Sequence, residues 1–176
     1  YYFNTNFGYQ TNGRGRNFSV DTGKGYKNLG FNVGLSHIKI GDRHAPSYSL
    51  TNSGKEEKGF NIGLHYHLSN FDIKFYYSYV DVNLALLRSS IFHSGNAISR
   101  AISSEEPLFI RPFSFDINEP NQLVDHHLAK VNINWWYNEN DKLSFVFGRQ
   151  LNKRKEFDVR RNAEKPIIDL DLITTD

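Results

Sequence analysis

An alternation of apolar and polar residues with a period of two constrains this chain more than any other feature of its sequence. Successive side chains of a β-strand point to opposite faces, so each alternating stretch predicts a strand with one apolar and one polar face. We therefore expect an all-β protein of about seven to eight strands. The seven clearest stretches are 1–10, 17–24, 29–36, 59–68, 71–79, 129–137 and 143–152.

The links between the predicted strands differ in length in a regular way. Short turns are expected at 25–28, 69–70 and 138–142. Long links are expected at 41–58, at about 85–121, and in a tail that begins near Lys153. The link at 11–16 is the exception, and its GRGR motif is interpreted as a hairpin turn. Short turns at one end and long loops at the other are typical of a bacterial outer-membrane barrel, where the turns are periplasmic and the loops extracellular.

The composition of the two faces favours the same architecture. The polar face consists mainly of Asn, Gly, Ser, His and Gln rather than the Lys and Glu that usually cover a sheet face in water. The apolar face is rich in aromatic residues, which make up 15% of the chain. Amphipathic rings near strand ends suit a membrane–water interface. We predict an antiparallel transmembrane β-barrel segment, with a soluble β-barrel as the less favoured alternative.

Composition also excludes several classes of function. The chain has no cysteine, so neither disulfides nor thiol chemistry contribute. A formal net charge of +2 gives no reason to expect nucleic acid as a partner. No apolar run is long enough for a transmembrane helix, and no signal peptide opens the chain. Because the chain starts in a strand pattern without methionine, we expect a mature or excised piece. No cofactor is expected.

The stretch NQLVDHHLAKVNINWW, at 121–136, carries an aspartate, two histidines and two tryptophans. Trp135, Trp136 and Tyr137 come where a strand meets a short turn, and we predict that they form an aromatic girdle at the periplasmic interface. Adjacent residues of a strand point to opposite faces, so His126 and His127 cannot bind one metal ion together. His126 is expected on the polar face and His127 on the apolar face. The sequence predicts no metal site.

The predicted long loops carry the residues that we expect to bind a ligand. Arginine and histidine side chains there suit an anionic chelate, which they would hold by charge-assisted hydrogen bonds. The arginines could equally pair with Glu105, Glu106 or lipopolysaccharide. The predicted ligand-binding set is Arg43, His44, Arg88, His93, Arg111 and His126.

Three smaller expectations concern the same loops. A short helix is expected within 95–107, with Asn96 as its cap and Ile98, Ala101 and Ile102 as an apolar stripe. The KEEK motif at 55–58 is interpreted as a solvated loop end. RKEFDVRR, at 154–161, is interpreted as a solvated extension of a strand pair or as a charge ladder between strands.

Three phrases, IGDRHAP at 40–46, HHLAK at 126–130 and LNKRKEFDVRR at 151–161, resemble the barrel of TonB-dependent outer-membrane receptors. The resemblance covers most of the chain. It implies a barrel of about 22 strands plugged by a separate N-terminal domain, so that residues 1–176 form a partial barrel without the plug.

The resemblance further implies energised uptake of a scarce nutrient, an iron chelate or similar, across the outer membrane of a Gram-negative bacterium. The implied partners are outer-membrane lipid, lipopolysaccharide, the small-molecule or chelate ligand, and the TonB complex through an N-terminal region outside these residues. The barrel residues would supply the wall, the girdle and part of the binding vestibule.

Two other functional classes stay open. One is a small closed eight-stranded outer-membrane barrel that acts as an anchor or adhesin, for which the chain length is well suited. The other is an outer-membrane hydrolase that uses Asp125 with His126 or His127, or Asp42 with His44. No nucleophile motif accompanies these residues, so we do not expect an enzyme and assign no catalytic residue.

Overall fold

The computed structural model of the chain describes residues 1–91, 94–159 and 166–175, and most of them belong to one antiparallel sheet. The sheet has eight strands, which follow one another in chain order. They are β1 (Tyr2–Gln10), β2 (Gly15–Tyr26), β3 (Leu29–Ile40), β6 (Lys55–His67), β7 (Phe71–Ala85), β8 (Asn121–Trp136), β9 (Lys142–Phe157) and β10 (Ile168–Thr175). The all-β, antiparallel prediction is confirmed.

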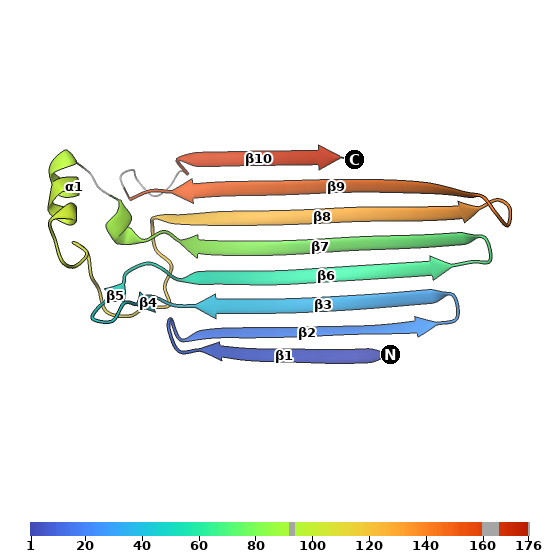
Figure 1. Ribbon diagram of the computed structural model, residues 1–176, viewed down its shortest axis with the longest axis horizontal. Helices are drawn as coiled ribbons and strands as arrows, with labels where there is room; N and C mark the ends of the chain where they lie inside the picture. The colour runs from blue at the N-terminus through green and yellow to red at the C-terminus, as the bar shows by residue number, and fades with distance from the viewer. Residues whose placement is uncertain (92–93, 160–165, 176) are drawn as a thin grey trace.

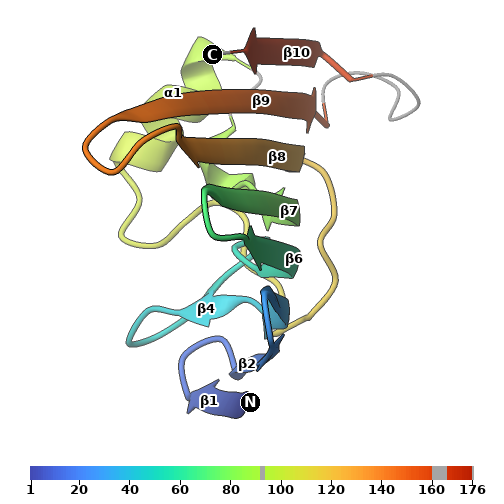
Figure 2. The same ribbon diagram turned by 90° about the vertical axis from the view of Figure 1, so that its right-hand side faces the viewer.

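The sheet is a single layer that does not close on itself. Figure 1 shows the strands side by side, and Figure 2 shows them nearly end-on, with β1 and β10 at opposite edges. A closed eight-stranded barrel requires these two strands to pair, whereas here each pairs only with its chain neighbour. The structure therefore shows an open sheet.

The strand registers align the apolar residues into rows across the sheet. One row runs from Phe147 through Val131, Phe75 and Leu64 to Phe31. Directly opposite residues of neighbouring strands lie on the same face, so the period-two alternation of each strand adds to one shared apolar face. The expected assignment of residues to the two faces is confirmed by these registers.

On the other face, glycines and polar side chains alternate between strands. The Asn61 side chain occupies the space into which a Cβ at Gly34 would project, and Asn32 does the same at Gly63. A larger residue at either glycine would collide with its neighbour's amide. This face therefore has a low, polar surface rather than a projecting layer of charged side chains.

Neither face is covered by a second layer of structure. Among the described residues the buried apolar side chains are those of Ala85 and Pro120, whereas many rings on the apolar face are widely exposed, such as Phe7 and Phe145. A soluble sheet normally packs its apolar face against a helix or another sheet. No described helix is long and apolar enough to cross a membrane.

The two ends of the sheet differ as the sequence predicts. At one end the turns are short, and at the other the links 41–54 and 86–120 form a cluster of loops (Figure 1). This cluster contains the small hairpin of β4 (Arg43–His44) and β5 (Ser49–Leu50), the 3-10 helix η1 (Arg88–Ser90) and the helix α1 (Gly95–Ile102). The turn 11–14 lies at the same end and is short, as expected.

Three local predictions are corrected. KEEK is not a loop end, because Lys55 to Lys58 form the start of β6 and pair with β3. The tail expected from Lys153 is instead the end of β9 followed by β10. The helix begins earlier than expected, since Ser94, not Asn96, is its cap and accepts a hydrogen bond from the backbone N–H of Ala97.

The charged end of β9 is paired with β10. Lys153 lies 4.0 Å from Asp171 and Lys155 lies 4.0 Å from Asp169, both across the strand pair. The structure thus contains a charge ladder between strands, in which Lys153 and Lys155 of β9 face Asp171 and Asp169 of β10. Arg160 lies outside the described residues.

Candidate ligand-binding site

Asn52, in the link between β5 and β6, holds the two ends of the long loop 86–120. It is buried and has a φ of +61°, a left-handed conformation that Asn adopts more readily than most residues. Its side-chain amide donates to the backbone oxygens of Leu86 and Pro120, both at 2.8 Å. Its Oδ1 accepts from the backbone N–H of Asn118 at 3.0 Å. One side chain therefore fixes where this loop leaves the sheet and where it returns.

Asp42 and Thr51, both buried, attach the middle of the same loop. The Asp42 carboxylate accepts a hydrogen bond from the backbone N–H of Ser114 at 3.3 Å. The Thr51 hydroxyl accepts from the N–H of Arg111 at 2.7 Å, and the Thr51 carbonyl accepts from the N–H of Arg88 at 3.1 Å. The main chains of the two arginines are therefore tied to one residue.

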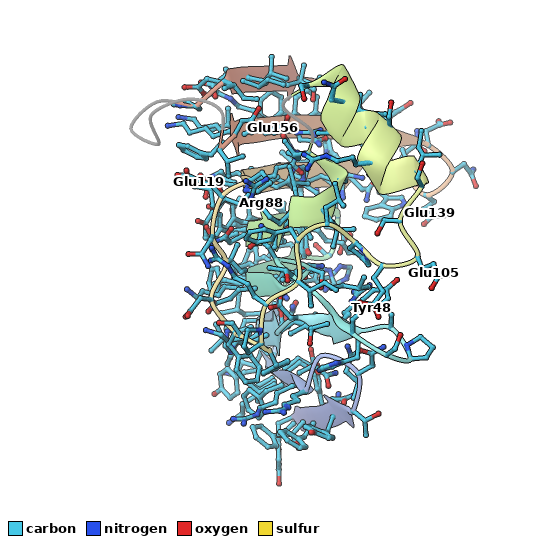
Figure 3. The ribbon with its side chains drawn as sticks, turned by 90° about the vertical axis from the view of Figure 1, so that its left-hand side faces the viewer. Tyr48, Arg88, Glu105, Glu119, Glu139 and Glu156 are labelled. Carbon is cyan, nitrogen blue, oxygen red and sulfur yellow. The ribbon has the colours of Figure 1, made fainter. Side chains whose placement is uncertain are left out.

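The side chains of Arg88 and Arg111 meet at the ring of Phe109. Their guanidinium carbons lie 5.0 Å and 4.7 Å from the ring centroid, within the range of a cation–π interaction. The three side chains line a pocket of about 350 Å³, which we call the arginine pocket. Figure 3 looks onto the loop end of the sheet and shows Arg88 beside Glu119, another residue of the pocket wall.

The arginine pocket has free hydrogen-bonding capacity. Within 1–91, 94–159 and 166–175, no carboxylate lies within ion-pair distance of Arg88 or Arg111. A guanidinium presents five N–H donors in a plane that matches a carboxylate or phosphate. The arrangement can therefore hold a small ligand with an anionic group and a flat apolar part. Asp116 and Glu119 in the wall would oppose a highly charged anion and favour a ligand that also carries donors.

A second hollow adjoins the first. It measures about 470 Å³, and His44 and Arg111 both line it. The His44 ring is stacked near Phe113, with 6.0 Å between centroids, and the Arg14 guanidinium lies 4.1 Å from the Phe113 centroid. The side-chain amide of Asn12 forms two hydrogen bonds with the His44 backbone: its Oδ1 accepts from the His44 N–H at 2.7 Å, and its Nδ2 donates to the His44 carbonyl at 3.1 Å.

The structure does not bring the whole predicted ligand set together. Arg88 and Arg111 share the arginine pocket, and His44 shares the second hollow with Arg111. Arg43 is exposed and lines neither hollow. His126 lies on the polar face of the sheet, where its ring is 3.1 Å from the Asn152 amide. His93 lies outside the described residues.

The predicted girdle residues lie at the short-turn end, divided between the two faces. Trp135 stacks on Phe71 with 5.7 Å between centroids and an interplanar angle of 1°, and Tyr137 contacts Trp135 edge-on. Trp136 is adjacent to Trp135 in the strand and faces the other side, with the Lys142 ammonium 5.8 Å from its ring. The apolar side of the cluster is therefore Phe71, Trp135 and Tyr137.

The aspartate–histidine pairs considered for a hydrolase do not form. Asp125 accepts a hydrogen bond from the Tyr79 hydroxyl at 2.9 Å, and His127 lies 2.8 Å from the Tyr77 hydroxyl. Asp42 bonds to loop backbone, and His44 contacts the Ser49 hydroxyl. That no residue is catalytic stays a prediction.

Glu56, on the loop side of the apolar rows, is the acidic group of a small charged cluster. The His37 ring lies 3.1 Å from its carboxylate, with Lys39 at 3.5 Å and Lys58 at 3.6 Å. The hydrogen bond to His37, followed by the charges of the two lysines, lowers the pKa of Glu56 below its usual range against the opposing effect of burial.

No protein-family model, curated protein or solved structure matches this chain.

Proposed function

We propose that this chain is part of the barrel wall of a TonB-dependent outer-membrane receptor that takes up a scarce nutrient, an iron chelate or similar compound, by energised transport. The observation that carries the proposal is the uncovered apolar face of the open sheet, combined with loops gathered at one end. In such a receptor the extracellular loops capture the ligand. A plug domain then rearranges when the TonB complex pulls on it.

A lipid bilayer explains the uncovered apolar face. Keeping exposed rings such as Phe3, Phe145 and Phe147 in water costs free energy relative to an apolar environment, on the order of 25 cal/mol per Å² of exposed apolar surface. Hydrocarbon removes this cost without requiring a second protein layer. The polar face, with its glycines and amides, then faces the interior of the barrel.

Aromatic rings at the strand ends support the same orientation. The cluster of Phe71, Trp135 and Tyr137 lies on the apolar side at the short-turn end. Tryptophan and tyrosine favour the level of the lipid headgroups, where the ring meets hydrocarbon and the polar edge meets water. The short turns would then be periplasmic, and the loop cluster with the arginine pocket would be extracellular.

The arginine pocket is the proposed ligand-contacting part of the loop cluster. Arg88 and Arg111 offer guanidinium donors that pair with no carboxylate of the described residues, and Phe109 offers an aromatic face between them. These groups suit a small chelate with carboxylate or catecholate-like oxygens next to a flat ring or metal complex. We place His44 at the edge of this binding region, through the hollow it shares with Arg111.

Uptake measurements on arginine variants test the proposal. An iron chelate of low net charge that carries one free carboxylate and an aromatic ring serves as the probe in cells that carry the intact receptor. Arg88→Gln and Arg111→Gln should each lower uptake at limiting concentration by about 10-fold or more, since a charge-assisted hydrogen bond contributes roughly 1.5–3 kcal/mol. Arg100→Gln, in the same loop but outside the pocket, is the matched control.

Several results would contradict the proposal. If a variant with both Arg88→Gln and Arg111→Gln takes up the chelate at an unchanged rate, at equal surface abundance, the pocket does not bind the ligand. If uptake does not depend on the proton-motive force, transport is not energised. If the protein is recovered in the soluble fraction, it is not part of a membrane barrel.

A further inference from the structure

A cluster of two histidines and one aspartate lies at the opposite end of the sheet from the loops. His65 and His67 are two residues apart in β6, so their side chains share the polar face. Asp72 is directly opposite His67 in β7, across the short turn that joins the two strands (Figure 1). The local hairpin therefore brings three side chains with metal-binding atoms together.

The potential ligand atoms are already close to one another. One ring nitrogen of His65, one ring nitrogen of His67 and one carboxylate oxygen of Asp72 all lie within 4.8 Å of each other. His65 contacts Asp72 Oδ1 directly, and His67 Nδ1 lies 3.6 Å from the same oxygen. Ligand atoms bound to one tetrahedral zinc ion lie roughly 3.3–3.6 Å apart, as follows from metal–ligand distances of about 2.0–2.2 Å. Small side-chain rotations would therefore bring the three atoms around one ion.

We propose that His65, His67 and Asp72 bind a divalent transition-metal ion, with zinc as the favoured ion. Two imidazoles and one carboxylate are a donor set that zinc uses in sites with three protein ligands and an open fourth position. Calcium and magnesium are disfavoured, because they prefer oxygen ligands alone. This site was not predicted from the sequence, where the adjacent pair His126 and His127 was the histidine pair weighed for metal binding.

The surroundings of the cluster are compatible with an open coordination position. The side chains of His65 and His67 are 47% and 58% exposed, whereas that of Asp72 is 11% exposed. His65 also lines a trough of about 580 Å³ on the sheet, together with Lys74, Tyr76 and Tyr2. A water molecule or a small ligand can therefore reach the ion from the polar side.

Lys74 determines which carboxylate oxygen is available. Its ammonium lies 3.5 Å from Asp72 Oδ2, while both histidines approach Oδ1. A carboxylate that is held by a second group keeps its orientation when it binds a metal ion. In this arrangement Lys74 positions Asp72 and leaves Oδ1 for the metal.

The alternative is a structural ion-pair cluster without a metal ion, in which Asp72 pairs with Lys74 and with one of the two histidines. His37, another exposed histidine that contacts a carboxylate, offers a direct comparison. It pairs with Glu56 near two lysines, and among the described residues it belongs to no group of three side chains that could hold a metal ion. An isolated histidine–carboxylate pair provides only two ligands and should bind zinc weakly.

Titration calorimetry with zinc chloride tests the proposal on the intact protein, purified in detergent. We expect the unsubstituted protein to bind one zinc ion at this cluster. In His67→Gln and in Asp72→Asn, binding of this ion should be lost, or its Kd should rise by at least about 10-fold. His37→Gln should bind zinc as the unsubstituted protein does. Cobalt(II), used as a coloured probe, should show visible absorption that is lost in the same two variants.

Both variants are needed because Asp72→Asn also breaks the contact with Lys74, whereas His67→Gln leaves it in place. Circular dichroism should confirm equal strand content before the titrations. Equal zinc affinity in all variants, or no zinc binding by the folded unsubstituted protein, would overturn the proposal. Zinc binding is measured without uptake, so its failure would leave the transport proposal untouched, and the converse also holds.

Discussion

At the scale of single residues, Asn52 has the largest predicted effect on the loop cluster. Asn52→Gly keeps the left-handed backbone available but removes three hydrogen bonds. At about 0.5–1.5 kcal/mol each, their loss should destabilise the attachment of the loop by roughly 2–4 kcal/mol. Hydrogen exchange of 86–120 should become faster, while exchange in the strands stays unchanged. Asn6→Ala, at an exposed position of β1, is the control. Unchanged exchange in the loop would contradict the assigned role.

Glu56 gives a prediction on pH dependence at the same scale. A carboxyl whose pKa is lowered in the folded state stabilises the fold above its unfolded pKa, and this contribution is lost as the pH falls through the lowered folded pKa. The melting temperature of the unsubstituted protein should therefore exceed that of Glu56→Gln at neutral pH, and the difference should shrink in acid. Glu139→Gln, in the exposed short turn, should show no such trend. A melting-temperature difference that does not change with pH would contradict a stabilising role of the ionised Glu56 carboxylate.

At the scale of elements, the helix α1 tests which residue is the cap. Ser94 Oγ accepts the hydrogen bond from Ala97, whereas Asn96 lies inside the first turn. Ser94→Ala should destabilise the helix by about 0.5–2 kcal/mol, because a backbone donor loses its partner. Asn96→Ala should leave the helix as stable or make it more stable, since Ala has the higher helix propensity. Hydrogen exchange of the helical amides distinguishes the two, and the reverse order would restore the expectation from the sequence.

The elements also show how far the sequence predicts the fold. Alternation identified seven strands, because each has an apolar face that the pattern reveals directly. It missed the start of β6, where the four consecutive charged residues Lys55 to Lys58 show no alternation, and it missed β10, although Ile168, Leu170 and Leu172 alternate there with Asp169 and Asp171. At the start of β6 both faces of the strand carry charged residues, so period-two hydrophobicity gives no signal there.

The candidate site was predicted only in part, for a related reason. Arg88 and Arg111 could be selected as cations in a long loop, but their meeting at Phe109 depends on hydrogen bonds to Thr51, far away in the chain. The alternation of Phe109, Arg111 and Phe113 in LFIRPFSF was the one local signal of this cluster. The histidine–aspartate cluster was likewise open to prediction, since a two-residue turn places Asp72 opposite His67.

At the scale of the whole molecule, we assign the two faces of the open sheet to different environments, one to lipid and the other to the barrel interior. Phe145 and Phe147 lie on the apolar face of β9. Gly148 lies on the polar face, opposite Lys130 of β8, with open space where a Cβ would project. If the sheet is a barrel wall, the first two contact lipid and the third faces the interior. In a soluble assembly, the apolar face would instead be covered by protein.

Site-directed spin labelling along β9 separates these two cases. The chain has no cysteine, so Phe145→Cys, Val146→Cys, Phe147→Cys and Gly148→Cys each introduce one labelling site in it. In lipid vesicles, we predict high accessibility to oxygen at 145 and 147, and high accessibility to a water-soluble nickel chelate at 146 and 148. Accessibility that does not alternate, or a chelate that reaches 145 and 147 most readily, would contradict a lipid-facing wall.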